Sequence, residues 1–196
     1  MRPPRHRIDW QVAQGLLSAI EPTPAEVAAA AGALAEAYSH PRNAPMMGHD
    51  QIFSPDDGIG HIEELRDEGG HPFLLWHDGA LAGDADLRGI GDGRAEFALL
   101  VAEPAAQGRG LGTRFAIMIH AFAFRTLGLE QVHVAIVPEN QPSLRLFARL
   151  GYHTDDSPVA RAYVEDPGEV SMSIRRADFE RGHAKALAEI RIHFRT

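Results

Sequence analysis

The sequence predicts a single α/β domain in which a mixed sheet carries helices on both faces. Three observations support this fold class. Segments with helical and strand periodicity follow one another as helices, three strands, helix, strand, helix and strands. Glycine and proline residues separate these segments. The 196 residues, 44% of them hydrophobic and 23% charged, are enough to bury one core.

The chain is expected to begin with a short strand at residues 16–20, followed by a helix. Thr23 can cap this helix, Pro24 suits its first position, and Glu26 completes a capping box. Apolar side chains then recur at helical spacing, at Val27, Ala31, Leu34 and Tyr38. A long loop at 40–53 leads to a second helix, which begins at Ser54-Pro55 and ends at Gly69-Gly70.

Strand patterns dominate the middle of the chain. Residues 73–76 and 80–87 flank an Asp78-Gly79 turn and predict a hairpin. A glycine-rich turn at 89–93 leads to a central apolar strand at 96–101, which Pro104 ends.

A long helix follows, with one apolar stripe of Leu111, Phe115, Met118, Ile119 and Phe122, and ends at Gly128. We then expect a strand at 131–137, a helix at 140–150, weaker strands at 161–165 and 170–174, and a helix at 177–192. The single domain, 1–196, would thus have a core of about 14–176 and a C-terminal helical extension, 177–196.

Composition narrows the function classes. The net charge of −8 argues against nucleic-acid binding and suits a cationic partner such as an amine, although solubility alone explains acidity as well. The absence of cysteine excludes disulfides and thiolate chemistry. No apolar segment follows the basic start or approaches the roughly 20 residues of a membrane span, so we expect a cytoplasmic protein without a membrane partner. The 11 histidines are scattered and form no H-E-x-x-H pattern, so we expect no metal.

The segment after the central strand carries the strongest functional signal. Gln107-Gly108-Arg109-Gly110-Leu111-Gly112-Thr113 places three alternate glycines where the long helix begins. Glycines let the backbone turn tightly, and the free N–H groups at a helix start attract anions. Arg109 adds positive charge, so the segment predicts a pyrophosphate site. The alternative is a glycine-rich turn without a ligand.

Two other phosphate loops fit less well. A P-loop needs a lysine, which this segment lacks. A dinucleotide loop needs glycine or alanine where Thr113 stands, and here a β-meander precedes the loop. Glu139 lies close to where a ribose-binding acid is expected, so this second alternative is weakened and stays open.

Two stretches resemble motifs of the GCN5-related N-acetyltransferase (GNAT) superfamily. Gln107, Gly110 and Gly112 match motif A, Gln/Arg-x-x-Gly-x-Gly/Ala, and residues 140–152 resemble motif B from its Asn to its Gly-Tyr end. Both occur in the right order and spacing, and the resemblance covers about 80–152. It implies an acyl-CoA N-acyltransferase fold that moves an acetyl or other short acyl group from acyl-CoA, in practice acetyl-CoA, to a primary amine by direct attack.

The resemblance also implies which residues bind the acyl donor. The pyrophosphate would be held by the backbone of six consecutive residues, namely Gly108, Arg109, Gly110, Leu111, Gly112 and Thr113. Leu100 and Val101 would pair with the pantetheine arm, and Asn140 would reach it or its bound waters. Ser143 and Phe147 would line the thiol end. The alternatives are a helix N-terminal polar group for Ser143 and a core aromatic for Phe147.

A mechanism follows from the same resemblance. Glu96, in a Glu-Phe-Ala run, is the candidate base that takes a proton from the amine, and an N–H of Leu100 or Val101 would bind the oxyanion. The family's proton-donating Tyr is replaced by Phe147, so Tyr152, Tyr163 or water would protonate the thiolate.

The acceptor would bind between the loop at 40–53 and residues 154–168. Candidate lining residues are Met46, Met47, Phe53, Asp155, Asp156, Glu165 and Asp166. These acids are also typical of solvated turns. The acceptor's identity stays open, and a homodimer is the default expectation. Competing hypotheses are a non-catalytic acyl-CoA sensor and a nucleotide-binding α/β enzyme.

Overall fold

The architecture comes from a computed structural model that describes residues 5–48, 51–102 and 110–195. Within these residues, nine strands form one sheet in the order β7-β8-β6-β5-β4-β3-β2-β1-β9. The pair β5–β6 is parallel, and the seven other neighbouring pairs are antiparallel. This mixed, mostly antiparallel sheet confirms the predicted fold class.

The strands and helices alternate along the chain much as the sequence predicts. The strands are β1 (Arg5–Val12), β2 (Gly15–Ile20), β3 (His71–His77), β4 (Ala80–Gly91), β5 (Arg94–Val101), β6 (Gln131–Ile136), β7 (His153–Thr154), β8 (Val170–Arg175) and β9 (Arg191–Arg195). The helices are α1 (Pro24–Ser39), the 3₁₀ helix η1 (Ala44–Met47), α2 (Pro55–Asp67), α3 (Leu111–Arg125), α4 (Gln141–Leu150), α5 (Pro158–Arg161) and α6 (Arg176–Glu189).

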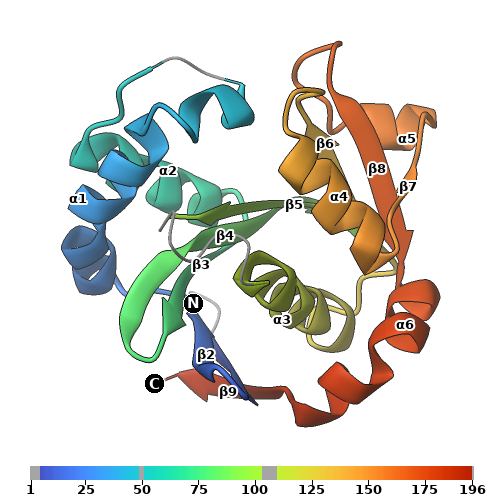
Figure 1. Cartoon of the computed structure of the whole chain (residues 1–196), viewed down its shortest axis with the longest axis horizontal. Helices are drawn as coiled ribbons and strands as arrows, with labels where there is room; N and C mark the ends of the chain where they lie inside the picture. The colour runs from blue at the N-terminus through green and yellow to red at the C-terminus, as the bar shows by residue number, and fades with distance from the viewer. Residues whose placement is uncertain (1–4, 49–50, 103–109, 196) are drawn as a thin grey trace.

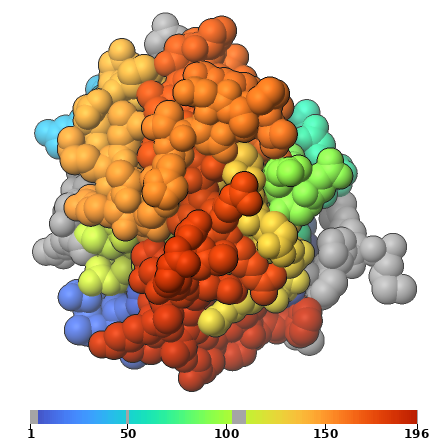
Figure 2. All heavy atoms as spheres, turned by 90° about the vertical axis from the view of Figure 1, so that its right-hand side faces the viewer, coloured from blue at the N-terminus to red at the C-terminus, as the bar shows by residue number. Residues whose placement is uncertain are grey.

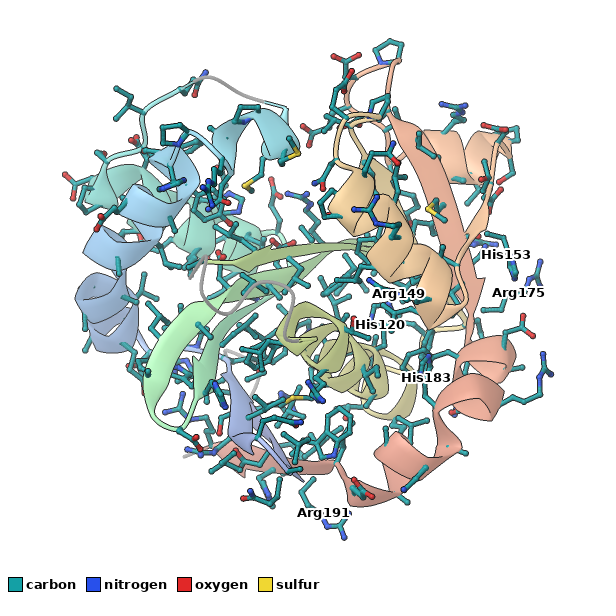
Figure 3. All side chains as sticks on the ribbon, viewed as in Figure 1. His120, Arg149, His153, Arg175, His183 and Arg191 are labelled. Carbon is teal, nitrogen blue, oxygen red and sulfur yellow. The ribbon has the colours of Figure 1, made fainter. Side chains whose placement is uncertain are left out.

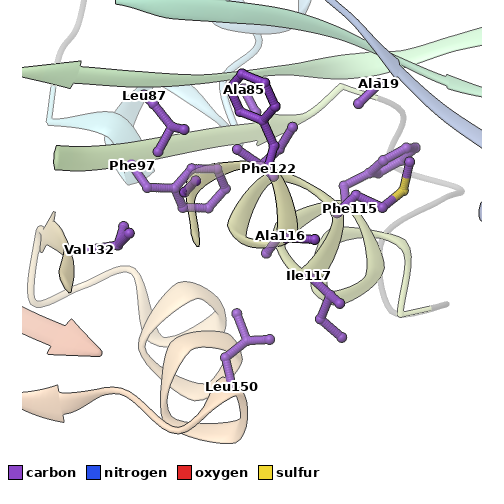
Figure 4. Packing of buried hydrophobic residues seen from close by; sticks show 14 of the residues in the cluster. Ala19, Ala85, Leu87, Phe97, Phe115, Ala116, Ile117, Phe122, Val132 and Leu150 are labelled. Atoms are coloured by element: carbon purple, nitrogen blue, oxygen red, sulfur yellow. The ribbon is translucent and has the colours of Figure 1, made fainter. Parts of the chain in front are cut away.

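Helices cover both faces of the sheet (Figure 1). Helix α3 lies against one face, where Phe115 and Phe122 are fully buried and pack with Phe97 and Leu87 of the strands (Figure 4). Burying one large apolar side chain stabilises a fold by roughly 1.5–3 kcal/mol, so this layer, which holds the larger apolar cluster, is expected to contribute more than the other face. Helix α6 and the segment from α4 to β8 form the surface seen in Figure 2, in red and orange.

Helix α1 lies on the opposite face, over a smaller apolar cluster. Ala30 and Leu34 of α1 pack there with Ile20 and Leu74 of the strands. The predicted capping box is present, because the Glu26 backbone N–H donates to Thr23 Oγ1 (3.3 Å) and the Thr23 N–H donates to Glu26 Oε2 (2.8 Å). The start of α1 is therefore specified locally, as the sequence predicts.

Four predicted elements need correction. Residues 16–20 form β2 and not the first strand, because β1 precedes it in the sheet. The turn predicted at 89–93 is shorter, since β4 extends to Gly91. Residues 161–165 are not a strand: Ser157 caps α5, and the chain continues in turns with bonds such as Val164 N to Arg161 O (3.2 Å). The last helix ends at Glu189, and residues 191–195 form β9 on the edge of the sheet.

The C-terminal strand is anchored on the start of α1. Strand β9 pairs with β1, and Arg195 Nη2 lies 2.7 Å from Glu26 Oε1. The hydrogen bond from Arg195 is the largest influence on the Glu26 carboxyl and lowers its pKa to about 2. The segment expected to be a helical extension thus adds a strand to the main sheet.

Gly83 marks a close approach between β4 and β5. Its φ is +151°, and a Cβ there would lie 1.9 Å from the Leu100 carbonyl oxygen. We expect Gly83→Ala to lower the free energy of unfolding by about 2 kcal/mol or more, measured by urea denaturation. Gly91→Ala on the same strand is the matched control, because its Cβ meets nothing within 4 Å. Equal stability of the two variants would contradict the prediction.

In the described part of the chain, none of the helices combines the length and apolar character that crossing a bilayer requires.

Candidate active site

Strands β5 and β6 diverge in the middle of the sheet. The two strands are paired from Arg94↔Gln131 to Glu96↔His133. After Glu96 and His133, no further pair between them is found in the described residues. Strand β5 continues to Val101 on β4, and β6 continues to Ile136 on β8. A parallel pair that separates in this way leaves room at its centre for an extended ligand to add to the sheet.

The start of α3 adjoins this divergence. Gly110 caps the helix in the left-handed conformation, with φ of 76°. A Cβ on Gly112 would lie 3.1 Å from Leu146 Cδ1 of α4 and 3.5 Å from Val101 Cγ2 of β5. The buried Leu111 and half-buried Thr113 complete the described half of the predicted pyrophosphate loop, while Gln107, Gly108 and Arg109 lie outside the described residues. The glycines therefore allow the helix start to approach β5 and α4 closely.

Asn140 links two segments that flank the divergence. Its Oδ1 accepts the N–H of Ser143 (3.1 Å) and caps α4. Its Nδ2 donates to the carbonyl oxygen of Met46 in η1 (2.8 Å). The structure thus brings the predicted acceptor loop to the predicted acyl-CoA residue.

Phe147 and Tyr152 lie in the core beneath α4. Their side chains are 6% and 3% exposed, and their rings are 5.1 Å apart. The Tyr152 hydroxyl donates to His120 Nε2 (2.5 Å), because His120 Nδ1 donates to the Ala116 carbonyl oxygen (2.7 Å). His120 is labelled beside α3 in Figure 3.

The electrostatics of this pair fit a structural role. Burial raises the pKa of Tyr152 well above 10 and lowers the pKa of His120 to about 4. Both groups are therefore neutral near pH 7. Tyr152 and His120 lie on the face of the sheet that α3 covers, as Phe97 does. Glu96 precedes Phe97 on β5, so its side chain lies on the opposite face.

Glu96 stands at the last register pair before the strands diverge. Its side chain receives a hydrogen bond from Arg88 Nε (3.0 Å). Burial raises the pKa of the Glu96 carboxyl, and this effect outweighs the opposing charge of Arg88; Asp86 and Glu165 raise it further. A half-buried carboxylate with a raised pKa is a stronger base than an exposed one.

His133 is Glu96's register partner on β6. It is fully buried, and neither ring nitrogen has a hydrogen-bond partner among the described residues. Burial lowers its pKa, and the Tyr163 ring stacks on it at 4.7 Å. Of the two tyrosines considered as proton donors, Tyr163 is the one on the Glu96 side of the sheet. Sequence reasoning missed His133, although it is a polar residue amid apolar neighbours in a buried strand.

Two aspartates, the half-buried Asp84 and the buried Asp86, lie on the same face as Glu96. Asp84 Oδ2 accepts the Tyr38 hydroxyl (2.8 Å), and burial raises the Asp84 pKa to about 7. Asp86 is 8% exposed, and burial likewise raises its pKa against the opposing charge of Arg88. Sequence reasoning missed both. Their signal is alternation, since Asp84, Asp86 and Arg88 share one face of a strand whose other face is apolar.

Most of the acidic residues predicted to attract the acceptor instead form hydrogen bonds or ion pairs with neighbouring residues. Asp155 accepts bonds from Ser173 and Ser157, Asp156 pairs with Arg161, and Asp166 accepts the Gly168 N–H. Glu165 differs, because its charge acts on both Arg88 and Glu96. Among residues 5–48, 51–102 and 110–195, no group of three His, Asp or Glu side chains is arranged to hold a metal ion.

The GNAT acetyltransferase domain family matches residues 20–153, more than half of the chain and all of the segment around the divergence. The chain belongs to this GNAT family.

This GNAT chain is also similar in sequence to a curated acetyltransferase. It is 26% identical over 120 residues to the spermidine N(1)-acetyltransferase of Escherichia coli K12. That match covers 60% of the chain and 63% of the relative, so it spans less than two thirds of that protein.

Solved structures share the fold. The RimJ protein of Mycobacterium smegmatis, in complex with CoA-disulfide, superimposes with a TM-score of 0.73 at 18% identity, over 97% of this GNAT chain and 99% of the other. The aminoglycoside acetyltransferase AAC(6')-Ib, in complex with coenzyme A, gives 0.68 at 20% identity, over 84% and 98%.

Proposed function

We propose that this GNAT chain transfers an acetyl or other short acyl group from acyl-CoA to a primary amine. The observation that carries the proposal is the divergence of β5 and β6 beyond Glu96, together with the glycine-rich start of α3, which packs against Leu99 and Val101 at the end of β5. A helix start suited to an anion, a gap suited to an extended ligand and a half-buried carboxylate thus lie along one strand. The names of relatives that acetylate spermidine or aminoglycosides agree with an amine acceptor.

The described residues fit an acyl-CoA donor. The N–H groups at the start of α3, from Gly110 to Thr113, would bind the pyrophosphate together with Gln107, Gly108 and Arg109. Leu100 and Val101 of β5 would pair with the pantetheine arm. Asn140 would reach the pantetheine arm or its bound waters, and Ser143 and Phe147 would line its thiol end. Phe147 would contribute apolar contact there, since its side chain has no ionisable group.

Glu96 would begin the reaction by accepting a proton from the acceptor's ammonium group. A lysine-like amine has a pKa of about 10.4, so this step is needed near pH 7. The neutral nitrogen then attacks the thioester carbonyl carbon, and a backbone N–H of Leu100 or Val101 donates to the developing oxyanion. When the C–S bond breaks, the nitrogen gives up its second proton and the thiolate takes one up, so that the amide and the free thiol are both neutral. Tyr152 was predicted as the proton donor, and this role stays a prediction. Because its hydroxyl is buried and hydrogen-bonded to His120, Tyr163 or water is favoured instead.

The strongest competing function is an acyl-CoA sensor without turnover. Phe147 in the usual tyrosine position and the burial of Tyr152 favour it. It predicts acyl-CoA binding and no free thiol with any amine. The nucleotide hypothesis predicts binding of NAD instead.

Calorimetry of acetyl-CoA binding tests the proposed site. We expect micromolar binding by the wild type and loss of at least about 100-fold in affinity in Gly110→Trp, because the side chain strains a left-handed position and fills the helix start. Gly128→Trp is the control, since it places the same residue at a positive φ beyond the other end of α3. An amine panel read out by free thiol release then tests turnover. A folded wild type that binds no acetyl-CoA would refute the proposal.

We also propose several further properties that the sequence predicts and that can be measured. They are one functional domain, a cytoplasmic location, a homodimeric state and no nucleic-acid partner. Size-exclusion chromatography with light scattering measures the oligomeric state, and electrophoretic mobility shift measures nucleic-acid binding.

A further inference from the structure

Strand β4 places acidic groups beside Glu96 on the face that α1 and α2 cover (Figure 1). Its buried Ala85 and Leu87 face the α3 core, so Asp84, Asp86 and Arg88 face the other way. In the register with β5, Arg88 is opposite Glu96, Asp86 is opposite Ala98, and Asp84 is opposite Leu100. The two aspartates therefore continue from the predicted base along the strand.

These carboxylates lack sufficient cationic partners among the described residues. Oδ1 of Asp84 and Oδ1 of Asp86 are buried and have no hydrogen-bond partner there. Arg88 is shared, since its Nε lies 3.7 Å from Asp86 and 3.0 Å from Glu96. Burying a carboxylate without a partner is unfavourable by several kcal/mol. A cation supplied by a ligand would remove this penalty.

The geometry suits an organic ammonium group. Tyr38 of α1 supplies a hydroxyl to Asp84 and Glu165 a negative charge near Glu96, while the charge of His61 on α2 opposes that of Asp86. No group of three His, Asp or Glu side chains in the described residues is arranged to hold a metal ion. Asp86 and Glu96 occupy diagonal positions on the antiparallel β4–β5 pair. Backbone positions in this relation are about 7–8 Å apart. The nitrogens of an extended four-carbon diamine are about 6 Å apart. One such molecule can therefore reach both carboxylates.

We infer that Asp84 and Asp86 bind a second ammonium group of the acceptor, which makes the preferred acceptor an α,ω-diamine or the terminal diamine unit of a polyamine. The inference rests on the proposed acyl transfer to amines and names its substrate class. Glu96 takes the proton of the reacting nitrogen, and the aspartates hold the distal nitrogen in its charged form.

The first test compares 1,4-diaminobutane with n-butylamine, using the wild type and acetyl-CoA. The two acceptors share a four-carbon chain and differ in the second ammonium group. We expect kcat/KM to be about 10- to 100-fold higher for the diamine, as one charge-assisted hydrogen bond would give. Equal values for both acceptors would overturn the inference and leave the acyl transfer intact.

Variants assign the effect to the two aspartates. In Asp86→Asn the ratio of kcat/KM for 1,4-diaminobutane to kcat/KM for n-butylamine should fall by about 10-fold. The ratio is the readout because Arg88 contacts both Asp86 and Glu96, so the variant changes the rate with either amine. Asp84→Asn gives a second, independent variant should Asp86→Asn fold poorly. Asp67→Asn is the control, because it removes the same charge from an exposed position at the end of α2. A preference that survives both aspartate variants, or falls as much in the control, would overturn the inference.

Calorimetry separates failure of the inference from failure of the proposed function. If the wild type turns over no amine, the acyl transfer is refuted, and 1,4-diaminobutane binding still tests the aspartates. Binding to the wild type that is lost in Asp86→Asn supports the ammonium site, and absence of binding overturns it.

Discussion

Replacement of Glu96 by glutamine is expected to lower kcat by about 10²- to 10⁴-fold, the usual contribution of a positioned general base. Glutamine keeps the size of the side chain and a hydrogen-bond acceptor for Arg88, but it cannot take a proton from the acceptor. Free thiol release with acetyl-CoA and the best amine measures the effect. The affinity for acetyl-CoA, measured by calorimetry, should change little.

The pH dependence gives this prediction a second readout. Burial raises the pKa of Glu96, and the base must be deprotonated to act. In the wild type, kcat/KM should therefore fall as the pH drops through this raised pKa, and Glu96→Gln should lose that limb. Glu64→Gln, at an exposed position on α2, is the control. A variant with wild-type turnover and an unchanged pH profile would show that another group is the base.

Replacement of Glu21 by glutamine is expected to lower the free energy of unfolding by about 3–5 kcal/mol, as loss of a buried charged pair does. Glu21 is 5% exposed and follows β2. Its Oε2 accepts from the His6 backbone N–H (2.5 Å) and from His6 Nδ1 (2.7 Å), and its Oε1 accepts from His71 Nδ1 (2.6 Å). An amide nitrogen in either position would face a donor.

Acid titration of stability checks the same group. Burial alone would raise the pKa of Glu21, but hydrogen bonds and charges of His71 and His6 outweigh it and hold the pKa below 4.5. Its stabilisation is therefore complete above pH 4.5 and is lost as the pH falls through the lower, folded-state pKa. Urea denaturation at several pH values should show this slope in the wild type and not in Glu21→Gln. Glu68→Gln, which is exposed, is the control; a similar loss there would contradict the prediction.

Local sequence signals predicted most of the elements that border the site. The Thr23 capping box, the Asp78-Gly79 hairpin turn and the Gly110 helix start depend on neighbouring residues, so they can be read without tertiary context. Strand β1 could not be read as easily. Its buried positions include His6 beside Ile8 and Trp10, and the polar His6 obscures the period of two. Strand β9 is largely exposed and depends on pairing with β1.

Only part of the candidate site could be predicted from the sequence. The start of α3 and strand β5 were predicted from motifs of consecutive residues. Asp84 and Asp86 were not, because their significance depends on a register that places them beside Glu96 and on burial that leaves one oxygen of each without a hydrogen-bond partner among the described residues. His133 is likewise of interest because it lies beside Glu96 on a neighbouring strand that is distant in the sequence.

The amide of Asn140 has a consequence for how the two substrates would influence each other. It caps α4 through Ser143 and holds the Met46 carbonyl of η1, so one side chain restrains the predicted donor side and the predicted acceptor side together. A ligand that shifts α4 must also shift η1 or break that hydrogen bond. We therefore expect the affinities for the two substrates to be linked, with each substrate changing the affinity for the other by the same factor.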